Sequence, residues 1–239
     1  MVNNLINDIK FKADFYALIL DNRRKVTTSQ AVSCWNGACK AMLNVERDAT
    51  FRRMPFSLES VKEVVLKSAE VGLSLAKEDK EAYIGMSAEE PGMFRLGYAY
   101  RGLRRLMLSH PEARMISSSL IYKDDKFEWR GNAAMPVVSS DSRGTHVVGA
   151  YAWFKLKTGE VYCVMLTEEE LLMAEHRDIE RAILIYGDEN QSFYRGHFRR
   201  RMFEIEAFKA LYRHCADVLN LQDISGESFA SASLVGQMD

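Results

Sequence analysis

Several features that mark common protein classes are missing from this chain of 239 residues. It has four prolines and no low-complexity tract, so we expect little disorder except near its C-terminal end. No apolar run approaches the roughly 20 residues that a membrane-spanning helix needs. The N-terminus has no positively charged segment followed by an apolar one, which argues against a secretory signal. These absences predict a folded protein of the cytoplasm.

Cysteine and histidine are too sparse and scattered to form a metal site or a disulfide framework. The four cysteines are Cys34, Cys39, Cys163 and Cys215, and none belongs to a C-x-x-C pair. The five histidines form neither H-x-x-x-H nor H-E-x-x-H. Structural zinc sites usually draw their ligands from close pairs, and disulfide frameworks belong to small secreted chains. We expect reduced, buried thiols and no metal site.

Motifs of nucleotide hydrolysis and covalent catalysis are also missing. There is no G-x-x-x-x-G-K-[ST] loop to hold ATP phosphates and no G-x-S-x-G nucleophile turn. The segment KDDKFEWR at 123–130 has carboxylates beside Lys126, as a metal nuclease would need, but it fits a hairpin turn more simply. These absences argue against P-loop ATP hydrolysis, acyl transfer and metal-nuclease chemistry.

What the sequence does contain is positive charge concentrated in short segments, although the net charge is only −1. Between Met93 and His110 there are four arginines and no acidic residue. If a helix begins near Tyr100, three of them share one side of it: Arg101, Arg104 and Arg105. Guanidinium groups without counter-charges repel one another until a negative partner arrives. Two partners stay open, a nucleic acid and the chain's own acidic segment at 168–180.

A strand carries the second cationic group. In HVVGAYAWFKLK (146–157), alternate residues share a face, and the face that includes Phe154 is entirely apolar. The opposite face holds two aromatic rings followed by two cations: Tyr151, Trp153, Lys155 and Lys157. Rings stack on bases at about 1–3 kcal/mol each and cations neutralise phosphates, which suits a single-stranded nucleic acid. The alternative is a second core face beneath a helix, with the lysines at its solvated end.

Helical periodicity predicts three helices in the first part of the chain. We place them at 3–20, from Ser29 to about Val45, and after Ser57, which is the expected N-cap of a helix that Gly72 stops. The first of these, with its apolar Phe15 and Ile19, is either core or a contact between protomers.

Short β-rich segments follow from 80 to 130, and the strand at 146–157 turns through Thr158-Gly159 into a hairpin. Thr167 and Glu170 form a capping box that opens a helix, and a last helix is expected at 194–219. Its basic residues include Arg195, Arg199, Lys209 and Arg213. Clustered strands between helices predict an α+β fold with a central antiparallel sheet.

Three separated cationic elements favour a nucleic-acid groove more than any one of them does. We expect Arg101, Lys155 and Arg199 to converge on one trough after folding.

Four blocks of the sequence, in order, resemble the RecT family of single-strand annealing proteins from phages and prophages. They are SLESVKEVVLKSAEVGLSL with EAYIGM, then YRGLRRLMLSHPEARMISSSLIYKDDKF, THVVGAYAWFKLKTGEV, and the stretch from His197 through Met202 to AFKALYRH. The resemblance covers roughly residues 25–220. It implies a RecT/Redβ-like fold with a helical region at 1–50 for oligomerisation, a DNA-binding core at 51–220 and a short flexible tail at 221–239.

The resemblance also implies an activity without bond chemistry, so we expect a protein that is not an enzyme and needs no cofactor. It would use no ATP, and Mg²⁺ would act at most as a stimulant without an evident site. Members anneal complementary single strands without ATP, promote strand invasion, and form rings or helical filaments with DNA in a basic groove. The implied partners are single-stranded DNA, the annealed duplex intermediate, further copies of the chain, a phage exonuclease and the host single-strand binding protein, in the bacterial cytoplasm and not at a membrane.

Combining the resemblance with the residue patterns, we expect phosphate contacts from Arg101, Arg104, Arg105, Lys155, Lys157, Arg199 and Lys209, and base contacts from Tyr98, Tyr100, Tyr151 and Trp153. Two other functions remain open. A passive protein that coats single strands would need a similar surface, and a scaffold would use the basic faces to hold an acidic protein.

Overall fold

The computed structural model describes residues 1–22, 26–87, 90–139 and 144–216. Contacts divide the described chain into two units. The first contains Met1–Gly102 and the second begins at Leu103. The helical region at 1–50 and the core at 51–220 expected from the sequence remain predictions, and the expected tail at 221–239 lies outside the described residues. The units are described separately below.

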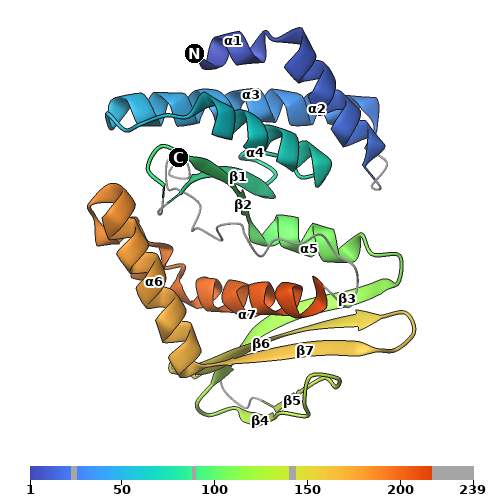
Figure 1. The fold of residues 1–239 in the computed structure, drawn as a ribbon. Coiled ribbons are helices and arrows are strands. Elements are labelled where there is room, and N and C mark those ends of the chain that lie inside the picture. The colour runs from blue at the N-terminus through green and yellow to red at the C-terminus, as the bar shows by residue number, and fades with distance from the viewer. Residues whose placement is uncertain (23–25, 88–89, 140–143, 217–239) are drawn as a thin grey trace. The chain divides into compact units, whose positions relative to one another are not determined.

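The first unit is built on four helices (Figure 1): α1 (Val2–Ile6), α2 (Ile9–Asp21), α3 (Thr28–Phe51) and α4 (Leu58–Glu70). The single helix expected at 3–20 is divided because Asp8 caps a new one, with its side chain accepting the amides of Lys10 and Phe11. Helix α3 is longer than expected and begins with a capping box between Thr27 and Gln30.

Both ends of α4 follow the predicted pattern. Ser57 caps its start by accepting the Ser60 amide at 3.2 Å. Gly72 ends it in the left-handed region at φ 68°, which a glycine adopts without strain.

An aromatic cluster joins α2 to α3. The ring of Trp35 lies 5.6 Å from Phe11 and 5.2 Å from Phe15, measured between centroids. Phe15 and Ile19 are both fully buried here. They form core within the first unit, which is the first of the two roles that the sequence left open.

A two-stranded antiparallel sheet completes the first unit. It pairs β1 (Ala82–Met86) with β2 (Phe94–Tyr98), so that Tyr83 lies opposite Gly97. Helix α5 (Tyr100–Leu108) follows and crosses the boundary between the units. A Cβ on Gly102 would lie 2.0 Å from the Glu81 carbonyl oxygen, so this position of α5 requires glycine.

The second unit contains a three-stranded antiparallel sheet in the order β3-β6-β7: β3 (Ala113–Tyr122), β6 (Val147–Leu156) and β7 (Val161–Thr167). A separate hairpin pairs β4 (Lys126–Glu128) with β5 (Val137–Ser139). The α+β class is confirmed, with antiparallel pairing throughout. The described strands form three small sheets, however, and not one central sheet.

The hairpin between β6 and β7 is confirmed, but its turn is longer than expected. The Leu156 amide donates to the Glu160 carbonyl at 2.9 Å, which leaves Lys157, Thr158 and Gly159 in the loop. Gly159 adopts φ 99°, a conformation that disfavours other residues. This connection has three residues where the sequence predicted two.

The helices of the second unit are α6 (Glu168–Tyr186) and α7 (Arg199–Ala216), joined by short 3₁₀ turns at Glu189–Gln191 and Phe193–Arg195. The capping box of Thr167 and Glu170 opens α6 as predicted. The last helix begins five residues later than the expected 194, because Gly196 is extended at φ −133°. Arg195 therefore does not lie on α7, and residues 217–219 are outside the described part.

Helix α7 covers one face of the three-stranded sheet (Figure 1). The ring of His214 on α7 lies 6.4 Å from that of Tyr162, which is paired with Phe154 and shares its face. Ala150, Ala152 and Phe154 are fully buried on this face. The apolar face predicted for the strand at 146–157 is thus the core face of the second unit.

No helix in the described part of the chain has the length and apolar character needed to cross a bilayer.

Candidate nucleic-acid interface

The sheet face opposite α7 carries the aromatic and cationic residues predicted from the sequence. Tyr151, Trp153 and Lys155 alternate along β6 with the buried Ala152 and Phe154, and each is partly exposed. We call the face that they share the outer face. The predicted alternation of the strand places these three side chains together, as expected.

The outer face is flanked by small hydroxyl residues on β3. Ser119 lies opposite Tyr151 and Ser117 lies opposite Trp153 in the strand register. On the other side of β6, Met165 lies opposite Tyr151 and the fully buried Cys163 lies opposite Trp153. Burial raises the pKa of the Tyr151 hydroxyl, so this group stays protonated at neutral pH and remains a hydrogen-bond donor.

The β4–β5 hairpin adds two aromatic residues that the sequence analysis did not select. The Phe127 ring lies 5.7 Å from that of Tyr151, and Trp129 is stacked on Phe127 at 6.5 Å with an interplanar angle of 18°. The alternation in KFEWR was the available signal, because it places both rings on one side of a strand. The sequence analysis interpreted this segment as a short β-rich stretch at a hairpin turn and did not assign its rings to the interface. The element that packs against Tyr151 is therefore a hairpin. It is not the helix expected if this side of the strand were a second core face.

The two lysines at the end of β6 differ in their surroundings. Lys157 is exposed, and its Nζ donates to the Pro111 carbonyl at 2.5 Å. Within the described residues of its unit, Lys155 has no carboxylate at ion-pair distance. Lys155 is therefore the cation of the outer face that is best placed to meet a phosphate.

Helix α5 presents the arginine side that the sequence predicted. Arg101, Arg104 and Arg105 are all exposed, while three apolar residues of the same helix are buried: Leu103, Leu106 and Met107. Neither Arg101 nor Arg104 has an ion-pair partner among the described carboxylates of its own unit.

The two tyrosines before this helix are less accessible. Tyr98 is 2% exposed and packs in the core of the first unit, opposite Ala82, so it does not lie on the surface. Tyr100, at the start of α5, is partly exposed.

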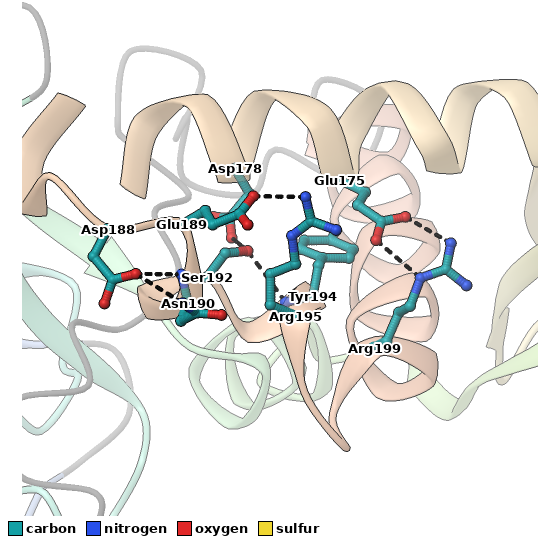
Figure 2. A network of polar contacts seen from close by, with 9 residues as sticks. All are labelled: Glu175, Asp178, Asp188, Glu189, Asn190, Ser192, Tyr194, Arg195 and Arg199. Atoms are coloured by element: carbon teal, nitrogen blue, oxygen red, sulfur yellow. Dashed lines mark hydrogen bonds and ion pairs between the residues drawn. The ribbon is translucent and has the colours of Figure 1, made fainter. Parts of the chain in front are cut away.

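The expected phosphate ligands of α7 already hold carboxylates. Figure 2 shows the Arg199 guanidinium in a two-pronged contact with Glu175 of α6, at 2.9 and 2.7 Å. This hydrogen-bonded carboxylate raises the pKa of Arg199. Lys209 donates to Glu206 at 2.7 Å, and its side chain is 5% exposed. Both cations thus have partners within the second unit, although the Arg199 side chain remains 44% exposed.

A polar network extends from Glu175 along the connection between α6 and α7 (Figure 2). The Ser192 hydroxyl donates to Asp178 at 2.6 Å, and Arg195 pairs with Glu189 at 2.7 Å. Burial raises the pKa of Tyr194 in this network. These contacts use acidic residues that the sequence analysis treated as a possible partner for the arginines of α5.

The trough expected between α7 and the hairpin strand is not formed within the second unit. Helix α7, with Arg199, packs on the face of Phe154, whereas Lys155 lies on the outer face. Strand alternation enforces this separation, because neighbouring residues point to opposite faces. Arg101 belongs to the first unit, which is described separately.

Among the described residues, no group of three or more His, Cys, Asp or Glu side chains could hold a metal ion. All four cysteines are free. Burial raises the pKa of Cys163 to about 11 and that of Cys215 to about 12, so both thiols stay protonated. Cys34 and Cys39 are partly exposed, so the expectation of buried thiols holds for two of the four.

Comparison with protein-family models finds a match to the RecT family over residues 33–203. The chain belongs to the RecT family. The matched range includes α5, the outer face and the β4–β5 hairpin, and it ends before Lys209. No curated protein matches the chain.

RecT proteins act in single-strand annealing and recombination, and they bind single-stranded DNA. They are annealing proteins and do not belong to the usual enzyme classes. The residues that this RecT-family chain exposes on α5 and on the outer face are of the kinds that such binding requires.

Proposed function

We propose that this RecT-family protein binds single-stranded DNA on the outer face of its β3-β6-β7 sheet and anneals complementary strands without ATP. The observation that carries the proposal is the row of Tyr151 and Trp153 beside the small serines of β3, ending in Lys155, which has no carboxylate at ion-pair distance among the described residues of its unit. Base stacking on such a row is worth about 1–3 kcal/mol per ring. It does not depend on base identity, as annealing of arbitrary sequences demands.

Phosphate neutralisation provides the annealing step. Two polyanionic strands repel each other, so cations that bind phosphates while leaving base edges accessible lower the barrier to pairing. In this proposal Lys155, Lys157, Arg101, Arg104 and Arg105 bind phosphates. Phe127 and Trp129 extend the stacking surface. Arg199, Lys209 and Tyr98 are assigned to packing.

The wider proposal concerns assembly and partners. The protein works as a homo-oligomer, in rings or filaments that hold DNA along a basic groove, and it promotes strand invasion as well as annealing. It acts in the bacterial cytoplasm during phage recombination, beside a phage exonuclease and the host single-strand binding protein.

An annealing assay tests the function. Two complementary oligonucleotides, one with a fluorophore and one with a quencher, are mixed with and without the protein, in the absence of ATP. We expect faster quenching than in buffer alone. A passive coating protein uses the same surface but slows quenching, and this result would replace annealing with coating. A scaffold for an acidic protein shows no single-strand affinity even at low salt.

A further inference from the structure

The outer face is partly covered, because one of its residues is fully buried. Cys163 lies opposite Trp153 in the strand register, so its side chain belongs to the outer face, yet it is 0% exposed. Tyr151 on the same face is only partly exposed. An element outside the three-stranded sheet must therefore lie over this part of the outer face.

The covering element is the β4–β5 hairpin, which lies on the side of the sheet opposite α7 (Figure 1). At its root, which follows β3, the Lys123 amide donates to the His146 carbonyl at 3.0 Å. Phe127 then contacts the central strand β6. At its tip, the connection 129–136, the Asn132 carbonyl accepts the Cys163 amide of the far edge strand β7 at 2.8 Å. The hairpin thus crosses the outer face from one edge of the sheet to the other.

The hairpin is held less firmly than the sheet beneath it. Its strands have three residues each and pair with one another as a separate sheet. A two-stranded hairpin is marginally stable by itself in water. Its rings, Phe127 and Trp129, are partly exposed, whereas Phe154 on the opposite face of the sheet is fully buried. The tip should therefore detach from β7 while the sheet stays folded, as weakly packed segments do.

Aromatic rings lie on both sides of the contact between the hairpin and the sheet. Trp129 stacks on Phe127 in the hairpin, and Tyr151 and Trp153 belong to β6. A flat base placed between these two layers stacks on both of its faces, a contact that every base can make. Stacking on the base replaces the contacts between rings that opening breaks. Lys155 follows on the same face and provides a cation for the phosphates of such a strand.

We propose that the β4–β5 hairpin is a clamp that closes over single-stranded DNA. The tip releases the edge of β7, a strand enters from the side, and the tip closes again with bases stacked between the hairpin and β6. This inference rests on the DNA binding proposed above for the outer face, and it adds how the strand enters and what retains it. Stacking uses the faces of the bases and leaves their edges free to pair.

Opening of the clamp is measured first on the whole chain without DNA. Cys163 lies beneath the hairpin and Cys215 lies on α7, and both are 0% exposed. The protein is treated with a maleimide at neutral pH, and digestion with mass spectrometry assigns the label to each cysteine. We expect Cys163 to react at least about ten times faster than Cys215, because the hairpin opens without global unfolding. Equal rates would mean that both thiols are reached by global unfolding alone, which overturns the clamp.

The same labelling with a saturating oligonucleotide then locates the strand. Bases held beneath the hairpin shield Cys163, so we expect its labelling to slow by at least about tenfold, and by more than that of Cys215. Fluorescence anisotropy in the same buffer verifies binding. Bound DNA with unchanged or faster labelling of Cys163 overturns the clamp and leaves the proposed function standing, whereas absence of binding overturns both.

Trp129→Ala tests whether the hairpin retains the strand. Loss of this ring weakens closure, so Cys163 of the free variant should be labelled faster, and an oligonucleotide should dissociate about tenfold faster than from the wild type. Trp129→Phe keeps a ring and should preserve slow dissociation. Phe198→Ala removes another exposed aromatic side chain of the second unit and is the matched control, with wild-type behaviour in both measurements. Unchanged or slower dissociation from Trp129→Ala contradicts a retaining clamp.

A circular oligonucleotide tests the route of entry with the wild-type chain. A strand that enters from the side needs no free end, so circular and linear single strands of the same length and sequence should associate with rate constants within about threefold of each other. Stopped-flow anisotropy gives both rates. Association of the circle that is at least about tenfold slower would show that an end must thread beneath a closed hairpin, and it overturns the opening of the tip.

Discussion

Lys209 and Lys155 carry the same charge, yet their surroundings give them different roles. Lys209 is enclosed beside Glu206, and its side chain is 5% exposed. Lys155 is partly exposed on the outer face and has no carboxylate partner in the described part of its unit. Removing one partner of a buried ion pair leaves the other uncompensated, whereas removing a surface cation costs little stability. Residue type alone does not separate these cases.

Lys209→Ala should therefore destabilise the protein without changing its DNA contacts. We expect the free energy of unfolding to fall by about 3–5 kcal/mol, since the Glu206 charge loses its partner. Urea denaturation measures this change, and Lys40→Ala on exposed helix surface is the control, with an effect within about 0.5 kcal/mol. A stable Lys209→Ala variant with a lower salt dependence of DNA binding would instead make Lys209 a phosphate ligand.

At the scale of the element, strand β6 divides its residues between two environments. Phe154 and Ala152 are buried beneath α7, and Tyr151, Trp153 and Lys155 lie on the outer face. The period of two is sufficient to predict this division. It also makes β6 the element in which one substitution tests the proposed interface with little effect on the core.

Lys155→Ala is expected to reduce the salt dependence of single-strand binding. The slope of log K against log salt should fall in magnitude by about 0.7–1, the amount for one phosphate contact. Fluorescence anisotropy of a labelled oligonucleotide at several salt concentrations gives the slope. Lys40→Ala should leave it unchanged. Equal slopes for Lys155→Ala and the wild type would remove Lys155 from the interface.

The turn that leads into β1 contains a strained residue. Lys80 has φ 53°, in the left-handed region that residues other than glycine rarely adopt. Lys80→Gly should raise the free energy of unfolding by about 0.5–1 kcal/mol, as judged by thermal denaturation. Lys77→Gly, three residues earlier and also exposed, should lower it because the strain is absent there. A loss of stability in both variants would show that the strain at Lys80 is smaller than the conformational-entropy cost of glycine.

The whole molecule is nearly neutral, with a net charge of −1 and a sequence pI near 6.5. Its cations are nonetheless local, on α5 and the outer face. Acidic residues such as Glu175 and Glu206 are engaged in contacts within the second unit. A protein of this kind attracts a polyanion through its nearby surface charge more than through its total charge.

Single-strand binding should accordingly be almost independent of pH between 7 and 9. Net charge becomes more negative over this range, but arginine and lysine remain protonated. At constant ionic strength we expect the dissociation constant to change by less than about threefold, as measured by anisotropy. A loss of affinity of tenfold or more by pH 9 would indicate that histidine or the total charge drives binding.

Local sequence patterns determined much of this protein before any contact was known. The arginine side of α5, the two faces of β6, the capping box at Thr167 and the stop at Gly72 each depend on residues within a few positions of one another. Backbone periodicity and capping act over that range, so the sequence is sufficient for them.

Only the tertiary structure decided which charges are available and which residues meet. Glu175 and Arg199 are 24 positions apart, and the pairing of Phe127 with Tyr151 requires a separate hairpin to fold onto the outer face. The burial of Tyr98 and the placement of Lys155 and Arg199 on different faces also depend on packing between distant segments. The net effect of a charge depends on its desolvation and its neighbours, and the folded chain supplies both.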